Sequence, residues 1–262
     1  MNAELRAAHF ARLQRQREGR KRSVQVGKLK IPVLERPGEQ IGTIVWPGAH
    51  LLSEALAAHD SDRRWPPQGC AGARVIELGS GVGLCGIAAA MLGANVTLTE
   101  RSDVLPLLSL NVQDGDVQQQ VRRAGGTARV RELNWGTDGV HQLLASLAPH
   151  QQKASEPASG AVRAFFDLIL GADIVYTQAP LGALHDTVCA LCPPGSSTTL
   201  LLAYRQRDAA IEARFFEALR GSGFVLVRSF TEAPEQQGRE AQKLLAFRRQ
   251  EVPSIHASQT DQ

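Results

Sequence analysis

Three alternating glycines, preceded by an acidic residue, are the part of this chain best suited to binding a nucleotide. Gly79, Gly81 and Gly83 follow a short apolar run that ends at Leu78, and the apolar segment 84–92 comes next. Glycine adopts backbone conformations that other residues avoid, and it lets a ligand approach the main chain closely. The start of a following helix presents free N–H groups. A strand, a glycine turn and a helix in this order predict the first half of a nucleotide-binding βαβ unit.

The spacing of these glycines can be matched to two cofactors. Gly81-x-Gly83-x-x-Gly86 fits the dinucleotide fingerprint of NAD(P)-dependent oxidoreductases, but Gly86 then lies well inside the helix. Glu77-x-Gly79-x-Gly81-x-Gly83 instead places every glycine in the turn, with an acid beside it. An acidic side chain is a poor neighbour for a pyrophosphate but a tolerable one for a cationic, zwitterionic ligand. The second match therefore favours S-adenosylmethionine (SAM) over NAD(P).

Other residues capable of chemistry each follow a predicted strand. Glu100 ends the second strand, about twenty residues after the first glycine, where an acid can bind ribose hydroxyls. Trp135 follows the third strand, where its ring could stack on an adenine. Segment 171–176 follows the fourth strand. Because ligands of parallel α/β sheets bind beyond the carboxyl ends of the strands, we expect these residues to meet at one edge of the sheet.

The alternation of apolar segments predicts an α/β fold with a Rossmann-like, seven-stranded, mostly parallel sheet and helices on both faces. We expect the last two strands to form an antiparallel pair, and a small N-terminal β-hairpin to lie outside the sheet. The predicted strands are 75–78, 95–100, 127–133, 166–170, 198–203, 224–230 and 243–247, with the hairpin at 23–35 and a short apolar segment at 41–46. The predicted helices are 84–92, 103–112, 138–147 (capped by Asp138), 181–192 and 208–220, with an earlier one after Pro47-Gly48.

The composition is that of a soluble globular protein. The chain has 262 residues, of which 43% are hydrophobic and 21% charged, enough for one α/β domain with a full core. No apolar run reaches the roughly 18 residues of a membrane span, and there is no signal-peptide segment. The phosphate-binding Gly-x-x-x-x-Gly-Lys-Ser/Thr motif is missing, which argues against an NTPase.

The four cysteines are too few and too scattered for a disulfide scaffold. We therefore expect a reducing compartment, the cytoplasm, with the nucleus as a second location. Cys189-x-x-Cys192 lacks a second pair of ligands, so we expect no metal site there.

We expect three parts along the chain. Residues 1–22 form a basic extension, 23–250 a single α/β domain with a flexible insertion at 149–164, and 251–262 a disordered tail. The basic segment 12–22 could contact nucleic acid, an acidic partner or a mitochondrial importer. A solvated extension is the simpler interpretation, and we do not expect nucleic acid as a partner.

Five segments in a fixed order resemble methyltransferase family 16, the seven-β-strand protein-lysine methyltransferases of the methyltransferase-like 21 type. The resemblance spans about residues 23–248, and the Asp-x-x-Tyr after the fourth strand is its most specific motif. The segments are Gly42-Thr-Ile-Val-Trp46-Pro, Glu77-Leu-Gly-Ser-Gly-Val-Gly-Leu, Thr97-Leu-Thr-Glu100, Leu133-Asn-Trp135-Gly and Gly171-Ala-Asp173-Ile-Val-Tyr176. One departure is Glu100, where an Asp is common in the family.

The resemblance implies where cofactor and acceptor bind. Asp173 and Tyr176 would be the catalytic residues, at the mouth that faces the acceptor: Asp173 would orient an ammonium, and Tyr176 would hydrogen-bond the amine or shape its channel. Glu77 would either order the cofactor's amino end or brace the turn. The residues implied to line the SAM site are Trp46, Gly79, Ser80, Gly81, Glu100, Trp135 and Ala172.

The resemblance also implies the reaction, which is methyl transfer from SAM to a lysine amine of a protein. The family includes enzymes that act on heat-shock chaperones and on valosin-containing protein, so a chaperone or an ATPase is the implied substrate. A monomer that binds a protein substrate and no membrane is expected. Three alternatives stay open: a methyltransferase acting on arginine, histidine or a small amine, an NAD(P)-dependent oxidoreductase, and a non-catalytic SAM-binding module. Arg205 and Arg207, just past the fifth strand, would meet an acidic substrate or be plain surface charge.

Overall fold

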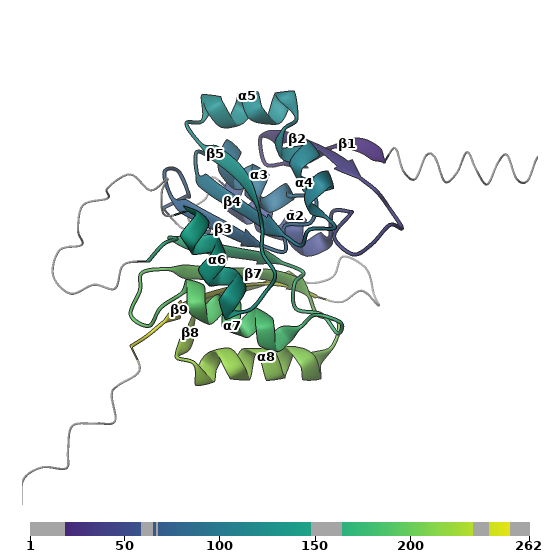
Figure 1. Ribbon diagram of the computed structural model, residues 1–262. Coiled ribbons are helices and arrows are strands. Elements are labelled where there is room, and N and C mark those ends of the chain that lie inside the picture. Colours follow the sequence, from purple (N-terminus) through teal and green to yellow (C-terminus); the bar gives the residue numbers. More distant parts are fainter. Residues whose placement is uncertain (1–18, 59–64, 67, 148–163, 233–240, 252–262) are drawn as a thin grey trace, which may run out of the picture.

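A seven-stranded sheet in the order β5-β4-β3-β6-β7-β9-β8 forms the centre of the molecule (Figure 1). The structure is a computed structural model that describes residues 19–58, 65–66, 68–147, 164–232 and 241–251. Neighbouring strands from β5 to β7 are parallel, whereas β9 is antiparallel to both β7 and β8, which confirms the predicted sheet. The strands are β3 (Arg74–Leu78), β4 (Asn95–Glu100), β5 (Thr127–Glu132), β6 (Leu168–Ala172), β7 (Thr199–Arg205), β8 (Phe224–Glu232) and β9 (Gln242–Arg249).

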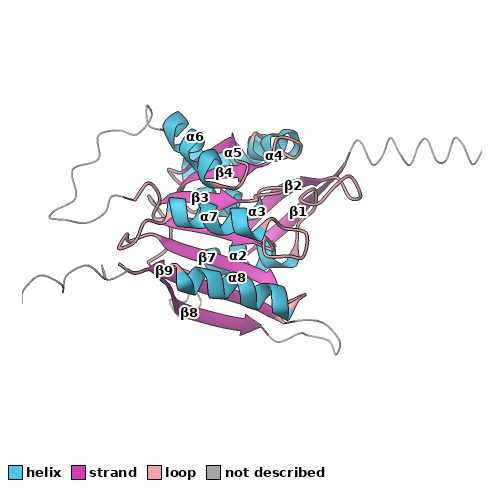
Figure 2. Cartoon of the chain, turned by 60° about the horizontal axis from the view of Figure 1, so that its bottom comes forward, coloured by secondary structure: helices cyan, strands magenta, loops and turns pink. Residues whose placement is uncertain are grey.

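Helices cover both faces of this sheet, as predicted. Apolar side chains of α2 to α5 pack with the hairpin into one core, and those of α6 to α8 form a second core on the opposite face. Figure 2 shows α6, α7 and α8 together on one side of the strands. The helices are α2 (Pro47–Ala57), α3 (Leu84–Met91), α4 (Leu105–Val112), α5 (Gly115–Arg123), α6 (Thr137–Leu147), α7 (Leu181–Leu191) and α8 (Ala209–Gly221).

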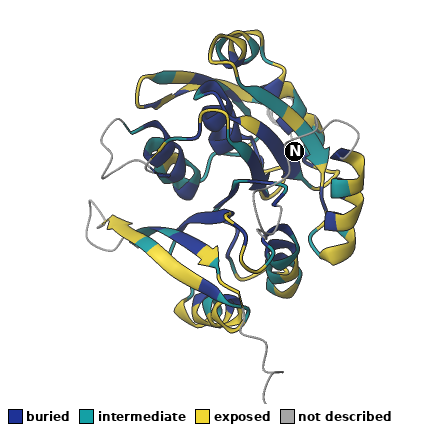
Figure 3. Ribbon diagram, turned by 90° about the vertical axis from the view of Figure 1, so that its left-hand side faces the viewer, coloured by how far each residue is buried: buried dark blue, intermediate teal, exposed yellow. Residues whose placement is uncertain are grey.

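Burial across the sheet is uneven. The central strands β3 and β6 are almost entirely buried, as parallel strands covered on both faces must be. The edge strand β8 is mostly exposed, and Figure 3 shows this contrast between interior and rim. Its pairing with β9 is interrupted by a bulge between Leu226 and Arg228. A bulge twists an edge and limits its pairing with other chains.

The N-terminal hairpin consists of β1 (Arg20–Val26) and β2 (Leu29–Glu35), and it starts three residues earlier than predicted. The buried side chain of Asn111, in α4, attaches this hairpin to the domain. Its Oδ1 accepts the N–H of Leu34 at 2.7 Å, and its Nδ2 donates to the carbonyls of Leu34 at 3.0 Å and Val82 at 2.9 Å. The hairpin is therefore part of the same packed unit as the glycine turn.

Helix α5 is an element that the sequence analysis did not predict. Asp114 caps it by accepting the N–H groups of Asp116 at 3.0 Å and Val117 at 3.4 Å. Only Val117 and Val121 are buried on its inner face. These two valines are four residues apart on one face of an otherwise polar helix, so the helical spacing and the Asp114 cap were both available as signals and were not used.

The structure defines two local features more closely. The short apolar segment 41–46 forms turns, and α2 begins at Pro47 itself. Proline suits the first turn of a helix because its missing N–H would be unpaired there anyway. Asp138 does not cap α6; it lies in the first turn, which begins at Thr137.

The remaining predictions about chain organisation fall mostly outside the described residues. The basic extension 1–22 is described only from residue 19, and of the predicted insertion 149–164 only residue 164 is described. The predicted tail 251–262 is described only at its first residue. Within the described part of the chain, none of the helices combines the length and the hydropathy needed to cross a bilayer.

Candidate active site

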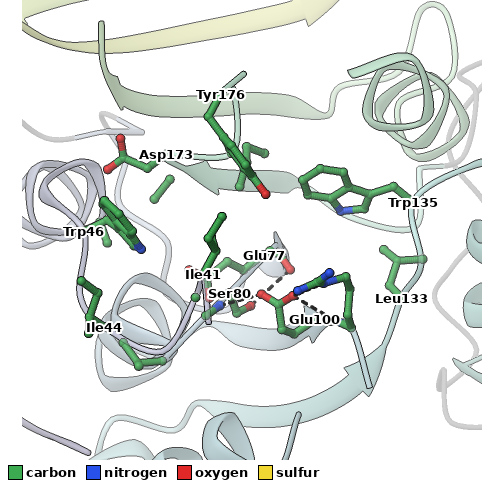
Figure 4. A pocket seen from close by; sticks show the side chains of 18 of the residues that line it. Ile41, Ile44, Trp46, Glu77, Ser80, Glu100, Leu133, Trp135, Asp173 and Tyr176 are labelled. Carbon is green, nitrogen blue, oxygen red and sulfur yellow. Dashed lines mark hydrogen bonds and ion pairs between the residues drawn. The ribbon is translucent and has the colours of Figure 1, made fainter. Parts of the chain in front are cut away.

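A cavity of about 490 Å³ opens at the carboxyl edge of the parallel strands (Figure 4). It is bounded by segment 41–49, which precedes and begins α2, and by the residues that follow β3, β4, β5, β6 and β7. All nine residues predicted for the site line this one cavity: Trp46, Gly79, Ser80, Gly81, Glu100, Trp135, Ala172, Asp173 and Tyr176. Residues from five strand ends and from the N-terminal segment are thus brought to one place.

The glycine turn is needed because other parts of the backbone approach it closely. Gly79 and Gly81 have φ angles of +60° and +54°, which side chains rarely tolerate. A Cβ at Gly81 would lie 2.8 Å from the carbonyl oxygen of Gly42, so the turn packs directly on the segment before α2. Gly86 serves a different purpose, since a Cβ there would lie 2.5 Å from the carboxylate of Glu77. This packing explains why α3 contains a glycine at position 86, so the glycine need not belong to a dinucleotide-binding fingerprint.

Glu77 is a buried carboxylate in the wall of the cavity. Only 2% of the residue is exposed, and its Oε2 accepts the N–H of Gly86 at 3.0 Å. Burial raises the pKa of Glu77 from 4.5 to about 7. The side chain therefore braces the start of α3, and it also lines the cavity at a position where a cationic group would stabilise its ionised form.

Glu100 connects the end of β4 to the glycine turn. Its Oε2 accepts the N–H of Gly81 at 2.9 Å, and its Oε1 accepts the N–H of Arg101 at 2.9 Å. Burial raises the pKa of this carboxyl above its usual value. Ser80 adds two more bonds between the same elements, because its N–H donates to the carbonyl of Thr99 at 2.9 Å and its Oγ accepts the Thr99 N–H at 3.1 Å. Each carboxylate oxygen of Glu100 keeps a lone pair for a hydroxyl.

Asp173 is held by three partners at once. Its φ is +53°, in the left-handed region, where aspartate is one of the few tolerated residues. Oδ2 accepts the N–H of Gly48, and Oδ1 accepts the N–H of Arg205 at 3.1 Å and lies 3.1 Å from Nη2 of Arg207. The side chain is only 2% exposed. Asp173 thus caps α2, the helix that starts at Pro47, from the opposite wall of the cavity.

The aromatic residues enclose the rest of the space. Trp46 lies beneath the guanidinium of Arg207, whose Cζ is 5.2 Å from the ring centre. Trp135 packs against the glycine turn, 3.3 Å from a Cβ built on Gly79. Tyr176 directs its hydroxyl into the cavity, toward the side of Trp135 and Glu100 (Figure 4), and burial raises the pKa of this phenol.

Several cavity residues were missed or undervalued by sequence reasoning. Ile41 and Ile44 line the cavity from the segment before α2, and Arg101 and Asn134 each come just after a strand end. The available signal was position alone, since each lies beside a residue that was recognised. Arg207 was considered as surface charge, whereas it forms part of the wall. Among the described residues, no cluster of three or more His, Cys, Asp or Glu side chains suits a metal ion.

The donors and acceptors of the cavity fit SAM. Among the described residues, the Nε1 atom of Trp46 is buried without a hydrogen-bond acceptor, so a ligand carboxylate would satisfy it. The carboxylate of Glu77 would hold the ligand's ammonium, and that of Glu100 its ribose hydroxyls. The small side chain of Ala172 and the ring of Trp135 leave a flat space suited to an adenine.

Comparison with known proteins identifies the family. A family model described as lysine methyltransferase matches residues 26–149 and 153–222. Protein N-lysine methyltransferase METTL21A of Danio rerio is 36% identical over 180 residues, 69% of this chain and 67% of the relative. EEF1A lysine methyltransferase 3 of Mus musculus is 32% identical over 199 residues, 75% of this chain and 71% of the relative. Protein-lysine N-methyltransferase EFM6 of Saccharomyces cerevisiae is 31% identical over 161 residues, 58% of this chain and 57% of the relative.

A comparison of structures supports the fold alone. The solved structure of the Pyrococcus horikoshii protein PH0793 superimposes with a TM-score of 0.53 at 11% identity, covering 88% of this chain and 72% of the other. Of the cofactors left open, family membership selects SAM over NAD(P). Because its family model matches most of the chain, the protein belongs to the lysine methyltransferase family, and SAM is its methyl donor.

Proposed function

We propose that this protein transfers a methyl group from SAM to a lysine amine of a protein substrate, of the chaperone or ATPase class. One observation carries the proposal: the residues suited to SAM and the Asp-x-x-Tyr pair line the same cavity. The three relatives compared above are each named as lysine methyltransferases. For this chain we call the part of the cavity wall formed by Asp173 and Tyr176 the acceptor end.

When bound, SAM supplies an electrophilic methyl on a sulfonium, so the protein's task is to present an amine lone pair in line with it. Glu77, Glu100 and the Trp46 indole N–H would bind the ligand's ammonium, hydroxyls and carboxylate. Much of the acceleration of such a transfer can come from positioning, with effective molarities of roughly 10⁵ M or more. The chain's own residues therefore act mainly by orientation and by excluding water.

At the acceptor end, a lysine must arrive as a cation and react as a neutral amine. The Asp173 carboxylate would hold the ammonium, and the Tyr176 hydroxyl would hydrogen-bond the nitrogen after the ammonium has released one proton to water. Burial favours the neutral form of an amine, because the charged form loses more solvation. Neither residue acts as a nucleophile in this scheme.

We propose the domain bounds, oligomeric state and location that the sequence pattern predicts. The catalytic domain spans 23–250 and contains the insertion 149–164, the basic extension 1–22 precedes it, and the protein acts as a monomer in the cytoplasm and the nucleus. All four cysteines are free thiols, which suits a reducing compartment.

Radiolabelled SAM added to a cell lysate tests the proposal, with wild type compared against Asp173→Asn and Tyr176→Phe. A discrete labelled band that needs the wild-type residues and contains methyl-lysine is the expected result. Methyl-arginine or methyl-histidine in that band would replace the lysine assignment by the second candidate, a methyltransferase of another acceptor. Measurable SAM binding without labelling of any macromolecule would favour a small-molecule acceptor or a non-catalytic module. Thermal unfolding of each variant shows that a loss of label is not a loss of fold.

A further inference from the structure

Arg207 places a positive charge at the acceptor end of the cavity. Its Nη2 lies 3.1 Å from Oδ1 of Asp173, and its Cζ lies 5.2 Å from the centre of the Trp46 ring. All three residues line the cavity. A buried carboxylate beside the face of an indole is the arrangement that binds an alkylammonium ion. The Asp173–Trp46 site therefore has the chemistry that a lysine side chain needs, and a cation of the chain itself occupies it.

The guanidinium can leave this site without moving the loop that carries it. The main chain of Arg207 is anchored separately, because its N–H donates to Oε1 of Glu212 at 3.0 Å, and Glu212 is only 5% exposed. The Arg207 side chain is 29% exposed, whereas that of Asp173 is 2% exposed. A rotation about its side-chain bonds would carry the guanidinium from the cavity wall into water.

Asp173 would stay in place after such a rotation. Its carboxylate also accepts the N–H of Gly48 through Oδ2 and the N–H of Arg205 through Oδ1. Both donors belong to the main chain, so they do not depend on the position of the guanidinium. The site is consequently preformed for a second cation.

The Arg207 guanidinium and a substrate ammonium compete for the same Asp173 carboxylate, and the carboxylate needs one of the two as its countercharge. A carboxylate that is 2% exposed is costly without a countercharge, because removing its partner leaves an uncompensated buried charge. Arg207 supplies that charge when no acceptor is bound. An incoming ammonium replaces it one for one, so Asp173 is paired both before and after the exchange.

We propose that Arg207 is an internal competitor for the acceptor: it occupies the Asp173–Trp46 site in the free enzyme and is displaced by the ammonium of the substrate lysine. The inference rests on the proposed function for the identity of the acceptor, but the exchange itself is a binding equilibrium with no covalent step. It makes Arg207 a determinant of specificity, since only a side chain that brings its own positive charge can take the guanidinium's place.

The test is a titration of n-butylammonium, which has the charge and length of a lysine side chain, into the protein saturated with S-adenosylhomocysteine. The readout is the ¹⁵N-labelled indole resonance of Trp46, assigned with Trp46→Phe. Arg207→Gln is compared with wild type and with Arg205→Gln. Arg205, the last residue of β7, contacts Asp173 through its main-chain N–H, so that variant removes the same charge two residues away and keeps the contact.

The expected result is a dissociation constant for butylammonium at least about tenfold lower in Arg207→Gln, because a site occupied about 90% of the time by a competitor loses that factor in apparent affinity. Arg205→Gln should match wild type. Arg207→Lys, which keeps the charge on a shorter arm, should fall between them, and it carries the test if thermal unfolding shows that the Gln variant does not fold.

Equal or weaker binding in a folded Arg207→Gln protein would overturn the proposal, and so would the lack of any Trp46 shift in all variants. A similar gain in Arg205→Gln would also overturn it, because the effect would then be one of general charge. No methyl is transferred in this assay. A failure to find methyl-lysine in the lysate would therefore refute the proposed function and leave the result of the titration standing.

Discussion

Replacing Glu77 by Gln removes a buried charge whose effect on stability depends on pH. Burial raises the pKa of Glu77 from 4.5 to about 7. Each unit of difference between folded and unfolded pKa corresponds to about 1.4 kcal/mol. The ionised carboxylate therefore costs the free protein about 3 kcal/mol at alkaline pH and nothing in acid. Between the two pKa values the folded chain holds more protons than the unfolded chain, so this residue makes stability fall as the pH rises.

The measurement is the free energy of unfolding in urea at pH 5 and pH 8, for wild type and Glu77→Gln without ligand. The variant should gain about 2–3 kcal/mol on wild type between these two pH values. Glu217→Gln, on the exposed side of α8, makes the same chemical change at the surface. Its free energy of unfolding should change between pH 5 and pH 8 by the same amount as that of wild type. If the free energy of unfolding of Glu77→Gln showed the same pH dependence as that of wild type, the Glu77 carboxyl would not be titrating in this range, and the buried-charge argument would be wrong.

Three further results are expected. Gly81→Ala should lower stability by about 1–3 kcal/mol in thermal unfolding, because the residue has a φ of +54° and its new Cβ would lie 2.8 Å from the Gly42 carbonyl oxygen. The control is Gly182→Ala in α7, where a Cβ meets nothing within 4 Å, and this variant should be as stable as wild type or slightly more stable. Asn111→Ala should cost about 2–4 kcal/mol, since two main-chain carbonyls and one N–H lose their partner, and unchanged urea unfolding would show that the hairpin is held otherwise. Glu100→Ala should weaken SAM binding about 10–100-fold in calorimetry through the lost hydroxyl contacts, and equal affinity would exclude the residue from the ribose site.

The placement of the candidate site was predictable because its residues follow a rule of topology. Glu100 ends β4, Trp135 lies three residues after β5 and Asp173 directly follows β6, and parallel strands end at the same edge of the sheet. Their convergence therefore needs only the order of the strands. Trp46 follows no strand of the sheet, and its place in the cavity could be expected only from the family resemblance.

What the sequence could not predict depends on contacts between distant segments. The partners of the Asp173 carboxylate are Gly48, Arg205 and Arg207, and no local pattern relates these positions. For the same reason Arg207 resembled ordinary surface charge. Helix α5 was missed because its composition is mostly polar, although Val117 and Val121 are four residues apart on its one apolar face.

The hydrogen bond from Gly48 to Asp173 joins positions 125 residues apart in the chain. A ribosome delivers the first of them long before the second, and domains generally fold as units once their partners have emerged. A nascent chain can thus carry a complete glycine turn while the wall opposite it does not yet exist. Because Asp173 follows β6, the two walls can meet only after the end of β6 has been made, and a chain that stops short of it lacks the cavity in which the methyl donor would bind.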